Sequence, residues 1–182
     1  MIPVGYMAKR IKVRPDWLNA SGVEDIYSVS GCISEDFTDY INYWKHNGYW
    51  FFDSPDIIKQ LAKDNSLDLT ATKLFFYEVY EFQFDDVECR WETFQPEASF
   101  TTQVAMPRDK TLDGYDVVTF YVRTKAECSP LSCNSLATMV ETNPRCLLTS
   151  VDQAKELLEE GKFNDAEPGP HRIFAVYSVA WS

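Results

Sequence analysis

Two stretches of this chain match each other at a displacement of 96 residues, and a repeat constrains the fold more strongly than any single motif. Six positions are identical when the ungapped segment 32–61 is aligned with 128–157: Cys32/Cys128, Asn47/Asn143, Ser54/Ser150, Asp56/Asp152, Lys59/Lys155 and Leu61/Leu157. Upstream, the match resumes with a four-residue change of offset that pairs Pro15 with Pro107 and Gly22 with Gly114. We therefore predict a tandem duplication. Convergence of two helices on serine caps is the alternative explanation.

The hydrophobic and turn patterns give each half the same order of elements: strand, strand, helix, short strand, helix, strand. In the first half we expect strands at 10–14, 23–30, 49–52 and 73–84, and helices beginning at Ser34 and Ser54. In the second half we expect strands at 115–124, 146–148 and 172–181, and helices at 134–141 and from Ser150 to Gly161. The predicted fold class is α+β. We expect two tandem related halves, 1–94 and 95–182, each an antiparallel or mixed sheet covered by two helices, packed together as one compact unit.

The helix beginning at Ser34 has a sequence typical of an N-terminus. Glu35 and Asp36 would lie in its first turn, where negative charge favours the positive end of the helix dipole. Phe37, Ile41 and Trp44 would form its buried stripe, and Asn47-Gly48 would end it.

Composition excludes several classes of protein. The chain has 182 residues, of which 45% are hydrophobic and 15% aromatic, so an unfolded chain is not expected. It has no run of 18 apolar residues that could span a membrane, and its first residues lead us to expect no secretory signal. We therefore predict a cytoplasmic protein. In that compartment its five cysteines would stay reduced.

Charge is distributed unevenly along the chain. Residues 1–14 carry four basic side chains and no acidic one, whereas the remainder carries 13 basic and 28 acidic side chains. An acidic body repels nucleic acid and anionic membranes, so neither is an expected partner. A basic protein is the partner that this charge favours, although acidic side chains also serve solubility alone.

The familiar catalytic motifs are absent. The seven glycines form no G-x-G-x-x-G or P-loop motif, and no serine lies in a G-x-S-x-G motif. His46 and His171 are the two histidines of the chain, so no H-E-x-x-H motif exists. These absences argue against nucleotide-binding, serine hydrolase and zinc hydrolase functions.

Cys128 and Cys133 lie five residues apart in a loop that leads to a predicted helix. Three interpretations are open: small hydrophobic side chains, a zinc site completed by Cys146 and His171, or a nucleophilic thiolate. As a nucleophile, Cys133 would lie near a helix N-terminus, with His171 as its base. We favour the first interpretation and expect no metal, cofactor or disulfide, with Cys32 and Cys146 buried.

The segment 40–52 is the densest aromatic stretch. With Phe37, Ile41 and Trp44 facing the core, Tyr40, Tyr43, His46 and Tyr49 remain as candidate partner-binding residues, because exposed tyrosines often anchor protein interfaces. The alternative is that the tyrosines wall the core with their hydroxyl groups in water.

Three segments, 43–55, 127–134 and 167–179, resemble a family of uncharacterised bacterial cytosolic proteins. The similarity spans nearly the whole chain and implies no known activity. The family has an aromatic residue at the place of His171, which argues against His171 as a base or ligand.

The sequence therefore predicts a non-catalytic, acidic protein of the immunity or inhibitor kind that binds a basic protein partner. The alternative is a small cysteine-dependent enzyme that uses Cys128 or Cys133.

Overall fold

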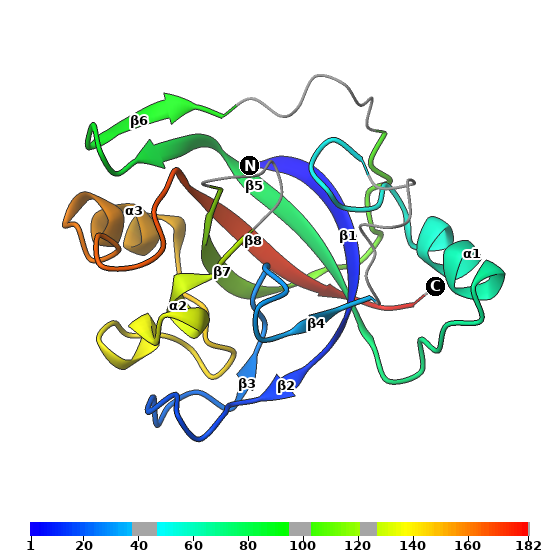
Figure 1. The fold of residues 1–182 in the computed structure, drawn as a ribbon. Helices are drawn as coiled ribbons and strands as arrows, with labels where there is room; N and C mark the ends of the chain where they lie inside the picture. The colour runs from blue at the N-terminus through cyan, green and yellow to red at the C-terminus, as the bar shows by residue number, and fades with distance from the viewer. Residues whose placement is uncertain (38–46, 95–102, 121–126, 182) are drawn as a thin grey trace.

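The computed structural model describes residues 1–37, 47–94, 103–120 and 127–181. One six-stranded antiparallel sheet forms the centre of the molecule, in the order β4-β1-β5-β8-β7, with β6 paired to the far end of β5 (Figure 1). The strands of this sheet are β1 (Ile2–Arg10), β4 (Glu35–Asp36), β5 (Lys73–Asp85), β6 (Arg90–Thr93), β7 (Thr111–Thr119) and β8 (His171–Val179). A second sheet pairs β2 (Lys12–Val13) with β3 (Asp25–Ile26).

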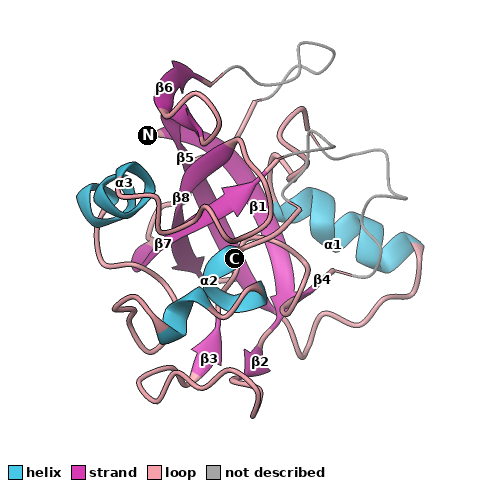
Figure 2. Ribbon diagram, turned by 60° about the vertical axis from the view of Figure 1, so that its left-hand side comes forward, coloured by secondary structure: helices cyan, strands magenta, loops and turns pink. Residues whose placement is uncertain are grey.

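The helices are short and lie around the sheet (Figure 2). They are α1 (Pro55–Asp64), α2 (Pro130–Cys133) and α3 (Val151–Glu159), with a 3-10 turn, η2 (Leu136–Thr138). Together with the antiparallel sheet they make an α+β protein, as the sequence predicts. Within the described residues, no helix has both the length and the apolar character needed to cross a membrane.

In the pairing of β5 with β8, Tyr77 lies opposite Val176, and this pair is the centre of a local symmetry in the sheet. The pairs Phe75–Ser178 and Val79–Phe174 lie two residues to either side of that centre. On the outer side of β5, Tyr6 of β1 pairs with Phe76, and on the outer side of β8, Tyr115 of β7 pairs with Ala175. The pairing of β1 with β5 on one side of this centre therefore has the same register as the pairing of β7 with β8 on the other side.

Each outer strand contains a glycine where another segment crosses it closely. Gly5 and Gly114 both have positive φ, +129° and +148°, and both lie at a register shift. A Cβ on Gly5 would lie 2.6 Å from the Phe52 carbonyl oxygen, and one on Gly114 would lie 2.8 Å from the Leu148 carbonyl oxygen. Both positions therefore require glycine, because a side chain would be strained and would clash.

Two asparagines brace these crossings with matching hydrogen bonds. Asn47 Nδ2 donates to the Val4 carbonyl oxygen, and its Oδ1 accepts from the amides of Tyr49 and Phe51. Asn143 Nδ2 donates to the Asp113 carbonyl oxygen, and its Oδ1 accepts from the amides of residues 145 and 147. The residue three positions later has positive φ in each case, 65° at position 50 and 61° at position 146.

A helix follows each braced segment. Pro55 occupies the first turn of α1, where a missing amide hydrogen costs nothing, and Ser54 makes no side-chain cap. Ser150 caps α3 by accepting a hydrogen bond from the Gln153 amide, as predicted, and Gly161 follows the helix with φ of 72°. Both helices bury one apolar side, which places them against the sheet.

The predicted helix from Ser34 is wrong at its start. Glu35 and Asp36 form β4, which pairs with Arg10 and Lys9 of β1. Phe37 is buried, as predicted, and Asn47 and Gly48 are described, whereas residues 38–46, which include Ile41 and Trp44, lie outside the described residues. Other boundaries also differ: β3 covers only two residues of the predicted strand 23–30, and residues 49–52 and 146–148 form single bridges.

The upstream part of the predicted alignment is also wrong. Gly114 lies inside β7, and the glycine that has the matching conformation and contacts is Gly5, not Gly22. Gly22 has no heavy atom near its missing Cβ.

Two hydrophobic clusters form the core, and each takes side chains from both predicted halves. The larger cluster contains Phe75 and Tyr77 together with Phe174 and Val176. The smaller one contains Ile26 together with Leu148, Leu158 and Ile173. The segments 1–94 and 95–182 therefore share their interior.

Candidate functional site

Two serine-rich loops, 28–34 and 127–135, meet beside the ends of β1 and β7. The second loop contains α2, which packs against β7 (Figure 1). The amide of Ser30 donates to Ser129 Oγ at 3.2 Å and so joins the loops directly. Surface loops often carry functional groups when a rigid scaffold holds them in place. Here two charged residues of the central sheet hold both loops in place.

Lys9 of β1 holds the first loop. Its side chain is 1% exposed, and its Nζ lies 2.7–2.9 Å from three consecutive carbonyl oxygens, those of residues 28, 29 and 30. The same Nζ lies 3.1 Å from Ser34 Oγ and 2.8 Å from Asp36 Oδ1. A buried ammonium group is tolerated only when it is paired and hydrogen-bonded, so this set of oxygens fixes the path of residues 28–36.

Asp116 of β7 holds both loops at once. Its Oδ2 accepts hydrogen bonds from the Val29 amide at 2.8 Å and from Ser129 Oγ at 2.6 Å. Burial raises the pKa of Asp116 to about 6, against hydrogen bonds from Ser129 and Val29 and the charge of Lys9, which lower it. The carboxyl group therefore titrates closer to neutrality than an exposed aspartate does.

Three cysteines converge where the loops meet. The Sγ atoms of Cys32, Cys128 and Cys133 all lie within 4.8 Å of one another. Cys128 is buried, Cys133 is half-buried and Cys32 is exposed. We call this group the trithiol centre. Its surroundings are polar: Cys128 Sγ donates to Asn134 Oδ1 at 3.2 Å, and Cys133 Sγ lies 3.9 Å from Ser30 Oγ.

The three sulfurs share their protons unequally. Hydrogen bonds from Cys128 and Cys133 lower the pKa of Cys32 to about 2, and Lys9 adds to this effect. Hydrogen bonding to Cys133 and Cys32, followed by burial, raises the pKa of Cys128. A hydrogen bond with Cys128 lowers the pKa of Cys133, but a hydrogen bond with Cys32 and burial raise it more, so that it rises to about 11. The first thiolate to form is therefore the exposed one, Cys32.

Protonation changes the role of Cys32. As a thiol, its Sγ donates to the Glu127 carbonyl oxygen at 3.0 Å. As a thiolate, it has no proton to donate and can accept from the two neighbouring thiols, in which case Cys128 gives up its hydrogen bond to Asn134 Oδ1, because a thiol has one proton. The centre can hold its first negative charge while two sulfurs remain protonated.

The four zinc ligands suggested by the sequence, Cys128, Cys133, Cys146 and His171, do not form one site. Cys128 and Cys133 do lie side by side, but their third partner is Cys32, and neither Cys146 nor His171 belongs to the group. Cys146 is buried, as predicted, and burial raises its pKa to about 12. The expectation that Cys32 is buried is wrong.

The proposed helix effect on Cys133 and the proposed role of His171 also need correction. Cys133 is the last residue of α2, so it lies at the wrong end of that helix for a thiolate to be stabilised. His171 is fully buried in β8, with its ring 5.7 Å from the Phe163 ring, and burial lowers its pKa.

Three of the four predicted partner-binding residues, Tyr40, Tyr43 and His46, lie outside the described residues. Tyr49 is described. It is half-buried, its ring lies 5.9 Å from the Phe94 ring, and burial raises its pKa. Tyr49 by itself therefore does not form the exposed aromatic interface that the sequence predicts, and the interface as a whole stays a prediction.

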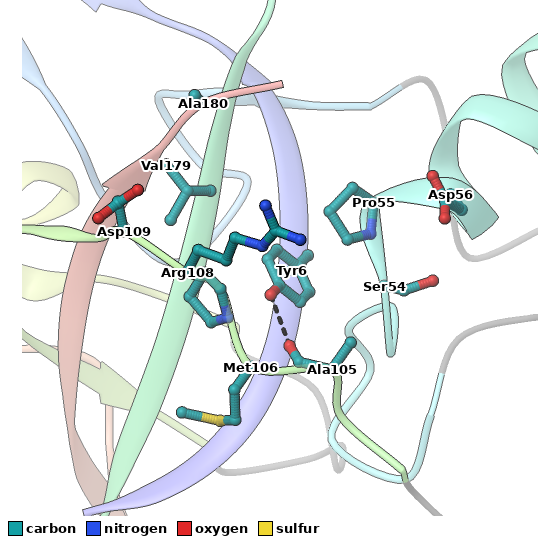
Figure 3. Close-up of a pocket in the computed structure, with 11 residues that line it drawn as sticks. Tyr6, Ser54, Pro55, Asp56, Ala105, Met106, Arg108, Asp109, Val179 and Ala180 are labelled. Carbon is teal, nitrogen blue, oxygen red and sulfur yellow. Dashed lines mark hydrogen bonds between the residues drawn. The ribbon is translucent and has the colours of Figure 1, made fainter. Parts of the chain in front are cut away.

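A separate pocket of about 520 Å³ opens beside the start of α1. Figure 3 shows Ser54, Pro55 and Asp56 facing Tyr6 and Arg108 across it. The Tyr6 hydroxyl donates to the Ala105 carbonyl oxygen at 2.5 Å and is therefore already used. The lining carries Asp56 and Asp109 as well as Arg108, so its charge favours no ligand class.

Sequence reasoning missed Cys32, Lys9 and Asp116 as parts of one site. One signal was available for Cys32: like Cys128 and Cys133, it lies in a loop rich in serine, whereas Cys146 is followed by two leucines. No local pattern marks Lys9 or Asp116. The partners of Lys9 lie 19–27 residues away in the sequence, and those of Asp116 lie 13 and 87 residues away.

No protein family, no curated protein and no solved structure matches this chain. The resemblance to uncharacterised bacterial proteins stays a prediction.

Proposed function

We propose that this protein binds one thiophilic metal ion through the trithiol centre. The observation that carries the proposal is the convergence of three sulfurs within 4.8 Å. Three thiolates around zinc, with Zn–S bonds of about 2.3 Å, lie about 3.8 Å apart, so each sulfur needs to move by less than about 1 Å. A disulfide needs only two cysteines. A third sulfur at the same point favours a metal ligand set.

The composition of the centre fits a soft ion. Thiolate ligands select Zn²⁺ and Cu⁺ over the oxygen-seeking Mg²⁺ and Ca²⁺. Cys32 provides the first thiolate, and Lys9 supplies a nearby positive charge. Ser30 Oγ can donate to a Cys133 thiolate and so orient it around an ion. The Asn134 amide can do the same for Cys128 only through Nδ2, because a metal-bound thiolate has no proton to donate to Oδ1.

The exposure of Cys32 bears on what the ion would do. A zinc ion with three protein ligands keeps its fourth position for water or a substrate, whereas a structural zinc site is closed by four. The described residues supply three ligands, and the exposed one lies toward solvent. We therefore propose an accessible ion, suited to catalysis or to metal transfer.

Cobalt substitution tests the proposal. Reduced, metal-free protein titrated with Co²⁺ should develop thiolate-to-cobalt absorption that saturates at about one equivalent. Zn²⁺ should then displace the cobalt. Cys32→Ser, Cys128→Ser and Cys133→Ser should each weaken binding by at least about tenfold, because one of three ligands is lost. Cys89→Ser is the matched control, since Cys89 is an exposed free cysteine outside the centre. Equal cobalt spectra in all four variants would overturn the proposal.

A second candidate is thiol–disulfide exchange, a form of the cysteine-dependent enzyme that the sequence suggests. It is favoured by the position of exposed Cys32 beside two other thiols. Cys32 thiolate would attack a substrate disulfide and release one substrate thiolate. The thiolate of Cys133 or Cys128 would then attack the mixed disulfide, which releases the second substrate thiolate and leaves a disulfide in the protein. Here Cys32, not Cys128 or Cys133, is the nucleophile.

Mass spectrometry of trapped thiols separates the two candidates. An exchange enzyme incubated with an oxidised small disulfide should form a disulfide between Cys32 and one neighbour, and a reducing agent should reverse it. A metal-binding protein should instead lose cysteine alkylation when zinc is added. If neither treatment changes the labelling of Cys32, both candidates fail.

The cytoplasmic location and the basic protein partner also remain proposals. A reducing compartment would keep the trithiol centre available for a metal. The excess of acidic residues over basic ones, 28 against 17, supports attraction of a basic partner. Capture that weakens steeply between low and moderate salt would support such a partner, and salt-independent capture would argue against it.

We also propose that the chain arose by duplication. The support lies in paired features that follow the same order in the chain: Gly5 and Gly114 in the outer strands, then Asn47 and Asn143, then the helices that follow position 54 and position 150. The two asparagines and the two helix starts are 96 residues apart, and the two glycines are 109 residues apart. An experimental structure in which residues 1–85 and 111–179 superpose over their backbones would test this. Different strand orders in the two segments would argue against common origin.

A further inference from the structure

Arg172 of β8 has an unusual environment for a basic residue. Its guanidinium carbon lies 3.8 Å from the centroid of the Phe94 ring and 3.9 Å from the centroid of the Phe120 ring. The two rings therefore flank the guanidinium group closely, at stacking distance. Its Nε donates to Gln83 Oε1 at 3.1 Å, and Gln83 is the neighbour of Arg172 in the β5–β8 register.

No carboxylate among the described residues pairs with Arg172, although the chain carries a formal charge of −11. The side chain is half-buried, and burial lowers the pKa of Arg172 to about 9, against the opposing effect of Tyr49. A cation in such surroundings costs free energy unless an anion or further hydrogen bonds compensate.

Arg145 shows what a completed arginine looks like in the same protein. Its guanidinium carbon lies 5.0 Å from the centroid of the Tyr27 ring, and its Nη1 lies 2.6 Å from Asp25 Oδ2. Arg145 thus has both an aromatic contact and a carboxylate. Arg172 has two closer aromatic contacts and a neutral amide.

We propose that Arg172 binds the oxyanion of a small organic acid with an apolar or aromatic body, and that a carboxylate is the preferred anion. The two rings engage the faces of the guanidinium, and Gln83 engages Nε. Among residues 1–37, 47–94, 103–120 and 127–181 no hydrogen bond uses the Nη atoms, so within this part of the chain the Nη edge is left to form the paired hydrogen bonds that suit a carboxylate. Phe94 and Phe120 are buried against the guanidinium, so half-buried Tyr49, which packs on Phe94, is the aromatic side chain nearest to hand for the apolar body. The proposal uses no residue of the trithiol centre and is independent of metal binding.

Benzoate and phenyl phosphate are suitable probes, because they share an aromatic ring and differ in the anion. The full-length protein should bind benzoate saturably in calorimetric or fluorescence titrations. Arg172→Gln should weaken binding by at least about tenfold, since a charged, bidentate contact is lost. Tyr49→Phe keeps the ring and tests its hydroxyl as a second donor, with a smaller, few-fold loss expected. Arg145→Gln, which removes the carboxylate-paired arginine, should leave benzoate affinity unchanged.

An NMR measurement keeps the test valid if a variant fails to fold. In wild-type protein with ¹⁵N-labelled arginine, benzoate should shift the Arg172 Nε resonance and leave that of Arg145 in place. Tighter binding of phenyl phosphate with the same Arg172 shift would assign the site to phosphate esters and overturn the preference for carboxylates. Absence of an Arg172 shift with both probes at millimolar concentration would overturn the site altogether.

Discussion

Lys9 and Arg172 are both basic residues of the central sheet that are withdrawn from water, but their surroundings differ in kind. Lys9 Nζ is surrounded by five oxygen atoms, including the Asp36 carboxylate. Arg172 donates one hydrogen bond, to a neutral amide, and otherwise contacts two aromatic rings. The first cation has its partners within the described chain, and the second has no anionic partner there.

The difference separates a structural charge from a binding one. A buried cation with a full set of partners fixes backbone, and Lys9 fixes the loop that carries Cys32. A half-buried cation that has no anionic partner is stabilised when a ligand brings an anion to it. The same sheet thus supports the trithiol centre through one basic residue and offers a candidate anion site through another.

The largest expected effect comes from removing each charge. Lys9→Met should lower the free energy of unfolding by about 3–5 kcal/mol, because it leaves Asp36 and a row of carbonyl oxygens without their partner. Arg172→Met should change it by no more than about 1 kcal/mol, since the lost ring contacts are offset by relief of desolvation. Urea unfolding followed by circular dichroism measures both.

Arg10→Met is the control for loss of one positive charge from β1. Arg10 is exposed, with Nη1 3.9 Å from Glu35 Oε2, so its loss should cost less than about 1 kcal/mol. The comparison would fail if Lys9→Met cost no more than Arg10→Met, or if Arg172→Met were as damaging as Lys9→Met.

The next effect concerns the pH dependence that Asp116 introduces. Its pKa is raised by folding, so the folded state binds its proton more tightly than the unfolded state between about pH 4 and pH 6. Ionisation therefore lowers stability as the pH rises through this window, by up to about 3 kcal/mol. Asp116→Asn keeps an acceptor for Val29 and Ser129 but cannot ionise, so its stability relative to wild type should rise from pH 4 to pH 7.

Unfolding measured at several pH values in this range checks the prediction. Asp109→Asn removes a carboxyl group at an exposed position and controls for net charge. A stability difference between Asp116→Asn and wild type that stays constant with pH would mean that Lys9 and the hydrogen bonds to Asp116 compensate fully for its burial.

The smallest expected effect tests whether Arg172 lacks only an anion. Gln83→Glu places a carboxylate at the acceptor of Arg172 Nε and should raise stability by about 1 kcal/mol. The same change should weaken benzoate binding, because the internal carboxylate competes for the guanidinium. Gln83→Leu removes the acceptor without adding charge and should lower stability instead. If Gln83→Glu strengthened benzoate binding, the account of Arg172 would be wrong.

The elements that sequence predicted well are those set by local signals. Strand β5 follows from its run of apolar and aromatic residues, and α3 follows from the cap at Ser150 and the stop at Gly161. The predicted helix at Ser34 failed because long-range partners prevailed. Asp36 is taken by Lys9, and β4 pairs with β1.

The trithiol centre could be predicted only in part. Cys128 and Cys133 lie close in sequence and were both singled out, whereas Cys32 lies 96 residues from Cys128. Its position depends on Lys9 and Asp116, whose hydrogen bonds to the backbone of residues 28–30 bring the first loop to the second. Such contacts join residues far apart in the chain, and no local pattern encodes them. Arg172 was missed for the same reason, because Phe94 and Phe120 lie 78 and 52 residues away.

X-ray absorption spectroscopy at the zinc edge tests the central claim most directly. Reduced protein loaded with one equivalent of zinc should give about three sulfur neighbours at roughly 2.3 Å and one lighter oxygen or nitrogen neighbour. In Cys32→Ser protein the number of sulfur neighbours should fall, whereas Cys89→Ser should leave the spectrum unchanged. Zinc surrounded only by oxygen and nitrogen, or the same sulfur count in both variants, would contradict the assignment of Cys32, Cys128 and Cys133 as a metal centre.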